Sequence, residues 1–169
     1  MTENEQQNIF ENWLQQHKAL LFKVIRSYAF NANDREDLFQ EITIQVWRSI
    51  PYFRKECAIT TWIYRVSLNT AIRWSQKEKK QTDSKKSFEE IGHLLYENKR
   101  EDERLEWLFE EIEKLNEIDR SLTLLMLDGF SYKEIAEIMG ISESVVGVKI
   151  HRIKKYLIKK SEEYIPYGI

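Results

Sequence analysis

The sequence SYKEIAEIMGISESVVGVKIHRIKKYL, from Ser131 to Leu157, predicts two helices joined by a tight turn. Ser131, followed three residues later by Glu134, forms a capping-box pattern that starts a helix. Gly140 is typical of a helix end where the backbone takes a positive φ, and Ser142 is suited to cap the next helix. A helix, a short glycine-containing turn and a second helix make up the helix-turn-helix pattern.

The second of these helices has one apolar and one basic side. Its apolar residues recur at helical spacing: Val146, Ile150, Ile153 and Leu157. The opposite side carries Ser144, Lys149, His151, Arg152, Lys154 and Lys155. Such a helix lies in the DNA major groove, where its first half meets base edges and its basic residues hold phosphates. A helical hairpin with a solvated basic face is the alternative, and the apolar turn before a capped, basic helix favours DNA binding.

The charge of the chain is segregated along its 169 residues. The net charge is −2, but residues 142 to 160 hold six Lys or Arg against one acid, which gives +5. Residues 97 to 120 hold ten acids against five bases, which gives −5. A local positive patch on a nearly neutral chain suits DNA contact that needs help from a partner.

Composition indicates a mostly helical protein, with 42% hydrophobic and 32% charged residues, five Gly and two Pro. The single Cys57 excludes an intrachain disulfide and a cysteine-based zinc site, and we expect no cofactor or metal. The polar start, MTENEQQ, lacks the basic region of a signal peptide, and no apolar run approaches the roughly 18 residues of a membrane helix. We therefore expect no membrane insertion and a cytoplasmic location.

Apolar periodicity predicts an all-α fold of two small helical domains joined by a polar linker. Three helices are expected in the first half, at residues 5–28 with a break near His17, at 34–50 and at 59–80. Asn33 with Glu36 is a candidate capping box for the second of these. Residues 88–96 form a short amphipathic patch, for which the sequence predicts no particular secondary structure.

Two further helices, at residues 101–116 and 118–127, precede the helix-turn-helix. The predicted boundaries are residues 1–80 for the first domain, 81–100 for the linker and 101–165 for the second domain.

Aromatic and basic residues alternate around the loop that follows Pro51. Phe53, Trp62 and Trp74 lie near Arg73 and a basic run that continues to residue 86. Rings that stack on bases, beside cations that follow the backbone, are typical of single-stranded nucleic-acid binding. Simple core packing is the favoured interpretation for any one of these rings, and for the three together it is an equal alternative.

Three stretches, in this order and spacing, resemble the extracytoplasmic-function (ECF) group of bacterial RNA polymerase sigma factors, in the sigma-70 family. They are DREDLFQE (34–41) with Val46-Trp47, FRKEC (53–57) with TWIYRV (61–66) and NTAI (69–72), and FSYKEIA through GIS (130–142). The resemblance implies a non-enzymatic subunit that binds polymerase core, directs it to promoters and initiates transcription. It also implies an anti-sigma factor as regulator.

The resemblance assigns residues to three surfaces. Contact with polymerase core falls on Asp37, Leu38, Gln40, Glu41 and Trp47. Opening and capture of the promoter −10 element, in the first domain, falls on Tyr52, Phe53, Arg54, Lys55, Trp62, Arg65, Asn69 and Arg73. Recognition of the duplex −35 element, in the second domain, falls on Ser144, Gly147, Val148, Lys149, His151, Arg152 and Lys155.

The chain departs from the family pattern at Gly147 and Val148, where a polar or basic residue is usual, and at Lys149, where Arg is usual. Glycine inside a helix costs about 1 kcal/mol relative to Ala. One hypothesis is that Gly147 lets the backbone approach DNA closely while Val148 touches a thymine methyl. Lys149 loses the bidentate geometry of Arg.

Two other functions are weighed. A stand-alone helix-turn-helix regulator would bind duplex DNA unaided, but no dimer interface or effector pocket is evident. A metal-dependent nuclease would use the clustered acids Asp34, Glu36, Asp37 and Glu41 to hold Mg²⁺. The exposed helical position of these acids and the scattered His residues argue against it.

Overall fold

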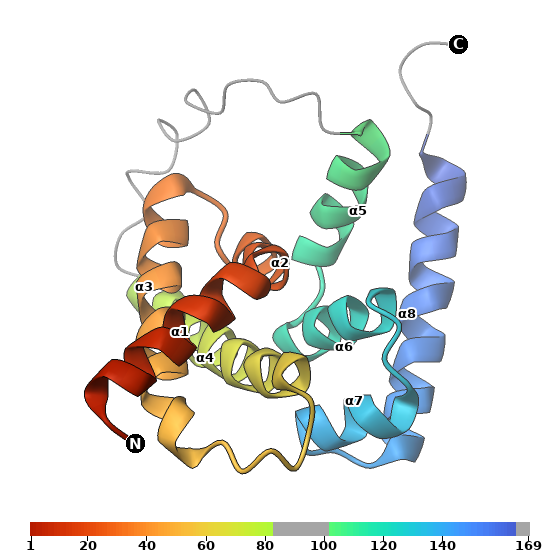
Figure 1. Ribbon diagram of the computed structural model, residues 1–169. Helices are drawn as coiled ribbons and strands as arrows, with labels where there is room; N and C mark the ends of the chain where they lie inside the picture. Colours follow the sequence, from red (N-terminus) through yellow and green to blue (C-terminus); the bar gives the residue numbers. More distant parts are fainter. Residues whose placement is uncertain (83–101, 165–169) are drawn as a thin grey trace. The chain divides into compact units, whose positions relative to one another are not determined.

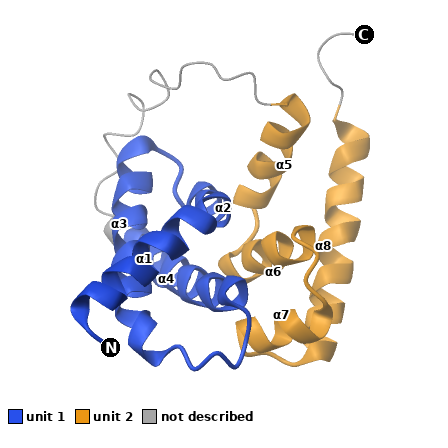
Figure 2. Ribbon diagram, in the orientation of Figure 1, with its two compact units in different colours: residues 1–95 blue, residues 96–169 orange. Residues whose placement is uncertain are grey.

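The computed structural model describes residues 1–82 and 102–164, and these residues contain helices and no strands. The chain divides into two compact units, Met1–Leu95 and Tyr96–Ile169 (Figures 1 and 2). This confirms the predicted all-α fold. No helix of the described residues is both long enough and apolar enough to span a membrane.

Within residues 1–82, the first unit contains four α-helices and one 3-10 turn (Figure 1). They are α1 (Glu3–Gln16), α2 (Lys18–Tyr28), α3 (Ala32–Ser49), η1 (Ile50–Tyr52) and α4 (Ile59–Thr82). The predicted break near His17 is confirmed, because this residue, at φ −110° and ψ 21°, separates α1 from α2. The segment predicted as linker begins inside α4, and from residue 83 it lies outside the described residues, as does the amphipathic patch at 88–96.

The apolar stripe of α3 forms the centre of this unit. Leu38, Ile42, Val46 and Ile50 are all 5% exposed or less, as the periodicity predicted. Helix α3 packs against α4, which also packs against α2. The α4 side of this core comprises Ile63, Tyr64, Leu68 and Ala71.

The predicted capping box at Asn33 is wrong. Asn31 caps α3 instead, since its backbone is extended (φ −132°, ψ 166°) and its Oδ1 accepts a hydrogen bond of 2.9 Å from the Asp34 amide. Asn33 lies inside the first turn. Two asparagines that share a short loop carry the same capping chemistry, and the backbone conformation decides between them.

The second unit contains α5 (Glu103–Glu113), α6 (Glu117–Leu127), α7 (Tyr132–Met139) and α8 (Glu143–Glu163). The helix-turn-helix is confirmed in detail. Ser131 and Glu134 form the capping box of α7, Gly140 takes the left-handed conformation at φ 68°, and the Ser142 side chain caps α8. The core of the second unit includes Leu122, Leu125, Ile135, Ile138, Val146, Ile150 and Ile153.

A buried carboxylate ties α5 to α8. Glu111, which is 5% exposed, accepts hydrogen bonds of 2.8 Å from the Tyr156 hydroxyl and from Lys114 Nζ. Burial by itself raises the pKa of the Glu111 carboxyl, but these two donors outweigh it and hold the pKa below its ordinary value of 4.5. The charged carboxylate therefore stabilises the packing of α5 on α8.

We predict that Tyr156→Phe lowers the free energy of unfolding of the second unit by about 1–2 kcal/mol, because a hydrogen bond to a charged group is lost. Since the Glu111 pKa is lowered on folding, this stabilisation is complete above the unfolded pKa of about 4.5 and is lost as the pH falls through the folded value. Urea titration at pH 7 and pH 3.5, followed by the NMR signal of Trp107, the one Trp of residues 96–169, measures it.

Glu110→Gln, an exposed neighbour on the same helix, is the matched control and should leave stability unchanged. An equal loss in the Tyr156→Phe variant at both pH values would show that the carboxylate charge contributes nothing.

Candidate nucleic-acid interface

A groove of about 340 Å³ runs along the first unit where α3, η1 and α4 meet. It is lined by Gln45, Arg48, Ser49, Tyr52, Trp62, Arg65, Val66, Asn69 and Arg73. Five of these are residues assigned to the −10 element from the sequence: Tyr52, Trp62, Arg65, Asn69 and Arg73. Residues from two separate segments thus meet in one groove that combines aromatic and cationic side chains.

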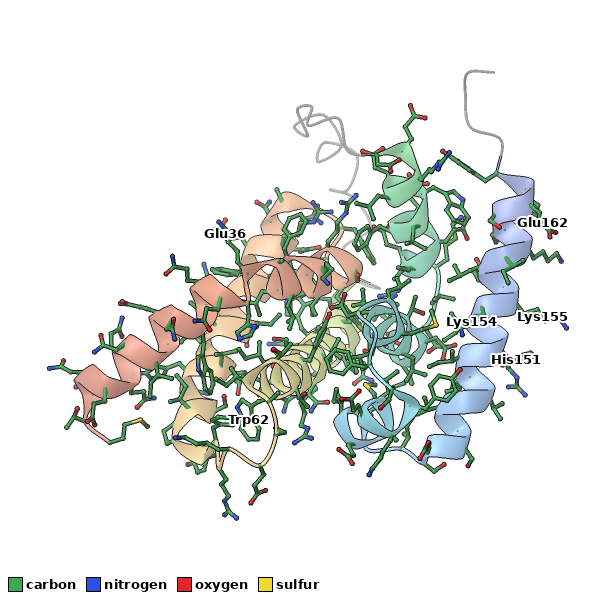
Figure 3. The ribbon with its side chains drawn as sticks, turned by 45° about the vertical axis from the view of Figure 1, so that its right-hand side comes forward. Glu36, Trp62, His151, Lys154, Lys155 and Glu162 are labelled. Atoms are coloured by element: carbon green, nitrogen blue, oxygen red, sulfur yellow. The ribbon has the colours of Figure 1, made fainter. Side chains whose placement is uncertain are left out.

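The groove presents one free ring and one fixed ring. The Tyr52 side chain is 73% exposed, whereas Trp62 is half-buried and donates a hydrogen bond of 3.0 Å from its indole nitrogen to Ser49 Oγ. Trp62 lies near the start of α4 (Figure 3). A fixed ring beside an exposed one is suited to holding an unstacked base.

The cations of the groove differ in their surroundings. Arg65 Nε is buried and has no hydrogen-bond partner among the described residues. Arg73 is exposed and donates from Nε to the backbone carbonyl of Asn69 at 3.2 Å. A buried guanidinium donor with no partner favours an acceptor supplied from outside, such as a phosphate or base oxygen.

The loop before α4 is anchored by Phe53 rather than offering this ring to solvent. The ring lies edge-on to Trp13, with centroids 5.3 Å apart, and tilted against Trp62 at 5.5 Å. Arg54 and Lys55 beside it are exposed, and Lys55 has a left-handed backbone at φ 60°, which is unusual for a residue with a side chain. Phe53 therefore supports the loop, and the side chains of Arg54 and Lys55 are open to solvent.

Gln45 and Arg48 also line the groove, and neither was predicted from the sequence as a site residue. They lie three residues apart on α3, the spacing at which helical side chains share a face. This spacing, together with the nearby Tyr52, is the sequence feature from which the two residues could have been predicted to line the groove.

The residues assigned to polymerase core on α3 differ in their exposure. Gln40 and Glu41 are exposed. Leu38 is 0% exposed and packs in the core, so it does not contact a partner directly. Asp37 is exposed but accepts a hydrogen bond of 2.9 Å from the buried indole of Trp74, which ties α3 to α4. Trp74 is therefore a core residue.

Trp47, assigned to the same face, lies half-buried at the contact between α3 and α1. Its ring is edge-on to Phe10 at 5.3 Å, and its backbone carbonyl accepts a hydrogen bond of 2.9 Å from Gln6. These contacts make Trp47 a packing residue between α1 and α3, with its side chain half-buried.

Two of the four acids considered as a magnesium site, Asp34 and Asp37, make hydrogen bonds within the fold. Asp34 accepts a hydrogen bond of 2.7 Å from Asn31 at the start of α3, and Asp37 accepts from Trp74. In residues 1–82 and 102–164, no group of three or more His, Cys, Asp or Glu side chains is arranged to hold a metal ion.

The outer side of α8 carries most of the residues assigned to the −35 element. The exposed ones are Ser144, Val148, His151, Arg152 and Lys155, and Val148 is 53% exposed. His151 and Lys155 project from the same side of the helix (Figure 3). This side is opposite to the buried stripe of Val146, Ile150 and Ile153.

Gly147 and Lys149 face other helices instead. A Cβ atom at Gly147 would lie 3.7 Å from Cε2 of Tyr132 on α7, an ordinary contact distance. Lys149 Nζ lies 3.3 Å from Oδ1 of Asp119 on α6. The close-approach hypothesis for Gly147 is thus weakened, because the missing side chain would point toward Tyr132.

An aromatic and cationic groove on one helical unit, with a helix-turn-helix on the other, is typical of a DNA-binding protein with two contact surfaces.

Comparison with known protein families supports this class of protein. Sigma-70 region 2 matches residues 13–81, and Sigma-70, region 4 matches residues 105–157. Among curated relatives, the ECF RNA polymerase sigma-E factor of Haemophilus influenzae is 31% identical over 141 residues, 76% of this chain and 75% of the relative. The protein of the same description from Escherichia coli strain K12 is 31% identical over 147 residues, 79% and 77% of the two chains.

Two solved structures share the fold. CnrH in complex with the cytosolic domain of CnrY is 20% identical, with a TM-score of 0.64 over 94% of this chain and 91% of that one. RpoE in complex with the anti-sigma factor NepR from Bartonella quintana is 19% identical, with a TM-score of 0.69 over 89% and 94%. The chain belongs to the ECF group of the sigma-70 family of RNA polymerase sigma factors, and is a sigma factor of transcription initiation.

The two glycines of the helix-turn-helix should respond oppositely to Ala. Gly140→Ala should lower the free energy of unfolding by about 1–2 kcal/mol, because a side chain at φ 68° is strained. Gly147→Ala should raise it by up to about 1 kcal/mol, because helix propensity improves and the new methyl group fits against Tyr132. Urea denaturation of both variants measures these effects.

DNA affinity of the Gly147→Ala variant should equal that of the parent. A large loss of promoter binding in a more stable variant would restore the close-approach hypothesis.

Proposed function

We propose that the first unit binds polymerase core through the outer face of α3 and captures the −10 element in the groove beside α4. The second unit then reads the −35 element with the outer side of α8. The observation that carries the proposal is the groove of about 340 Å³, where Tyr52 and Trp62 lie beside Arg65 and Arg73. Family membership supports the same assignment of the two units.

The groove suits a flipped base for a physical reason. Unstacking a base costs a few kcal/mol, and stacking on an aromatic ring returns about 1–3 kcal/mol per base. Tyr52 supplies an open ring, and the Arg65 guanidinium supplies a donor that lacks a partner among the described residues. The exposed Arg54 and Lys55 extend the positive charge along the path of the strand.

The contact with core is proposed for Gln40 and Glu41, with Asp37 at its margin. Leu38 is buried in the core, and its burial fixes which side of α3 faces solvent. An exposed acidic and amide-bearing helix face is complementary to a basic partner surface.

We further propose that the protein is non-enzymatic and acts in the cytoplasm, where polymerase core is found. An anti-sigma factor is proposed as its regulator. The support is the ECF family itself and the structural relatives, of which RpoE is described in complex with the anti-sigma factor NepR.

Run-off transcription with purified core polymerase, on a pool of upstream genomic fragments, tests the function. Transcripts should depend on the protein and identify its promoters. The variant Gln40→Ala/Glu41→Ala should bind core about tenfold more weakly, since central interface residues cost about 1–2 kcal/mol when truncated. Asn12→Ala, an exposed polar residue of α1, is the control.

No core binding and no transcript, together with tight duplex binding by the protein alone, would favour the stand-alone regulator.

Tyr52→Ala should reduce the lifetime of the open promoter complex about tenfold, because one stacking contact worth about 1–3 kcal/mol is lost. Tyr52→Phe keeps the ring and should behave like the parent. Tyr52 is the variant of choice because its side chain is 73% exposed, whereas Trp62 also packs on Phe53. Open-complex decay after a heparin challenge measures the effect. Equal decay for the Ala and Phe variants would exclude stacking at this residue.

A further inference from the structure

Lys149 joins the basic side of α8 to an acid on another helix. Its Nζ lies 3.3 Å from Oδ1 of Asp119, in the first turn of α6. The Lys149 side chain is 35% exposed and that of Asp119 is 21% exposed. The pair is therefore partly shielded, while its cation remains open to solvent.

The acid of this pair is held in place. Asp119 Oδ2 accepts a hydrogen bond of 3.0 Å from Asn116 Nδ2, and the Asp119 amide donates to Asn116 Oδ1 at 2.9 Å. Asn116 caps α6, and a negative charge in a first helical turn is favoured by the helix dipole. Asp119 is thus a fixed acceptor, and Lys149, with its flexible four-carbon stem, is the partner that moves.

Lys149 lies within one helical turn of exposed residues on the outer side of α8. Val148 precedes it, and Arg152 follows three residues later, a spacing at which helical side chains are neighbours. A rotation of its side chain would bring the ammonium toward a phosphate bound beside Arg152. Such a phosphate competes with the Asp119 carboxylate for the same cation.

We propose that Asp119 sets the strength of DNA binding by α8, because it holds Lys149 in an intramolecular ion pair that DNA has to displace. This inference rests on the proposed reading of DNA by α8. The acid weakens binding because it withholds one cation, the Lys149 ammonium, from the phosphates. Asp119 is not itself a DNA contact.

Asp119→Asn is the decisive variant, since it removes the charge and keeps the side chain's size and its oxygen acceptor. Promoter binding by the holoenzyme, measured by fluorescence anisotropy over a range of salt concentrations, should become about two- to fivefold tighter, the range expected for a partly exposed ion pair. One additional phosphate contact should also steepen the salt dependence by about one unit.

The double variant Asp119→Asn/Lys149→Gln separates release of Lys149 from a general charge effect. The gain from Asp119→Asn should vanish when Lys149→Gln is the background. An equal gain in both backgrounds would overturn the proposal, and so would weaker binding of Asp119→Asn, which would make Asp119 a support for α8.

Glu163→Gln is the matched charge control. It breaks the exposed pair of Glu163 with Lys160, 3.1 Å apart at the end of the same helix, and should leave binding unchanged. Arg152→Gln tests the underlying function. If it lowers affinity while Asp119→Asn has no effect, only the present inference fails; if Arg152→Gln also has no effect, DNA reading by α8 fails as well.

Discussion

Burial of the apolar stripe of α3 against α4 is the constraint on which the first unit depends. A helix has one rotational phase that buries Leu38, Ile42 and Val46 together, and all three are 1% exposed or less. That phase leaves Gln40 and Glu41 outside and brings Gln45 to the groove beside α4. The polar surface on one side and the groove on the other are therefore consequences of one packing requirement, and a change in the core would move both.

The second unit follows the same logic, with the turn as an additional constraint. Gly140 ends α7 in a left-handed conformation, and Ser142 starts α8 two residues later. The short turn fixes where α8 begins, and burial of Val146 and Ile150 fixes its phase. The turn and the buried stripe together determine which side of α8 is exposed. A helix-turn-helix can therefore present a defined set of side chains although many different sequences form the motif.

Local features could be predicted from the sequence, and long-range contacts could not. The capping box of Ser131, the left-handed Gly140 and the break at His17 depend on neighbours within four residues. The positions of Phe53, Trp47 and Lys149 depend on Trp13, Phe10 and Asp119, which lie 30 or more residues away. These residues were assigned to surfaces by family pattern, whereas packing decides whether each side chain is available. Leu38 shows the same limit, because a pattern match does not distinguish a contact residue from the core residue beneath it.

The modest positive charge of α8 gives a physical reason why a sigma factor binds promoters together with polymerase core. Residues 142–160 contain six basic residues, but Lys149 has a carboxylate partner within the chain. Non-specific DNA affinity rises with the number of phosphates neutralised, so this internal pair lowers the affinity of the second unit alone. Two weak contacts become strong when one scaffold holds both on the same DNA, because the second contact is then intramolecular. Polymerase core, by holding both units of a sigma factor, would supply that scaffold. Modest charge on α8 thus favours promoter binding by the assembled holoenzyme over binding by the free protein.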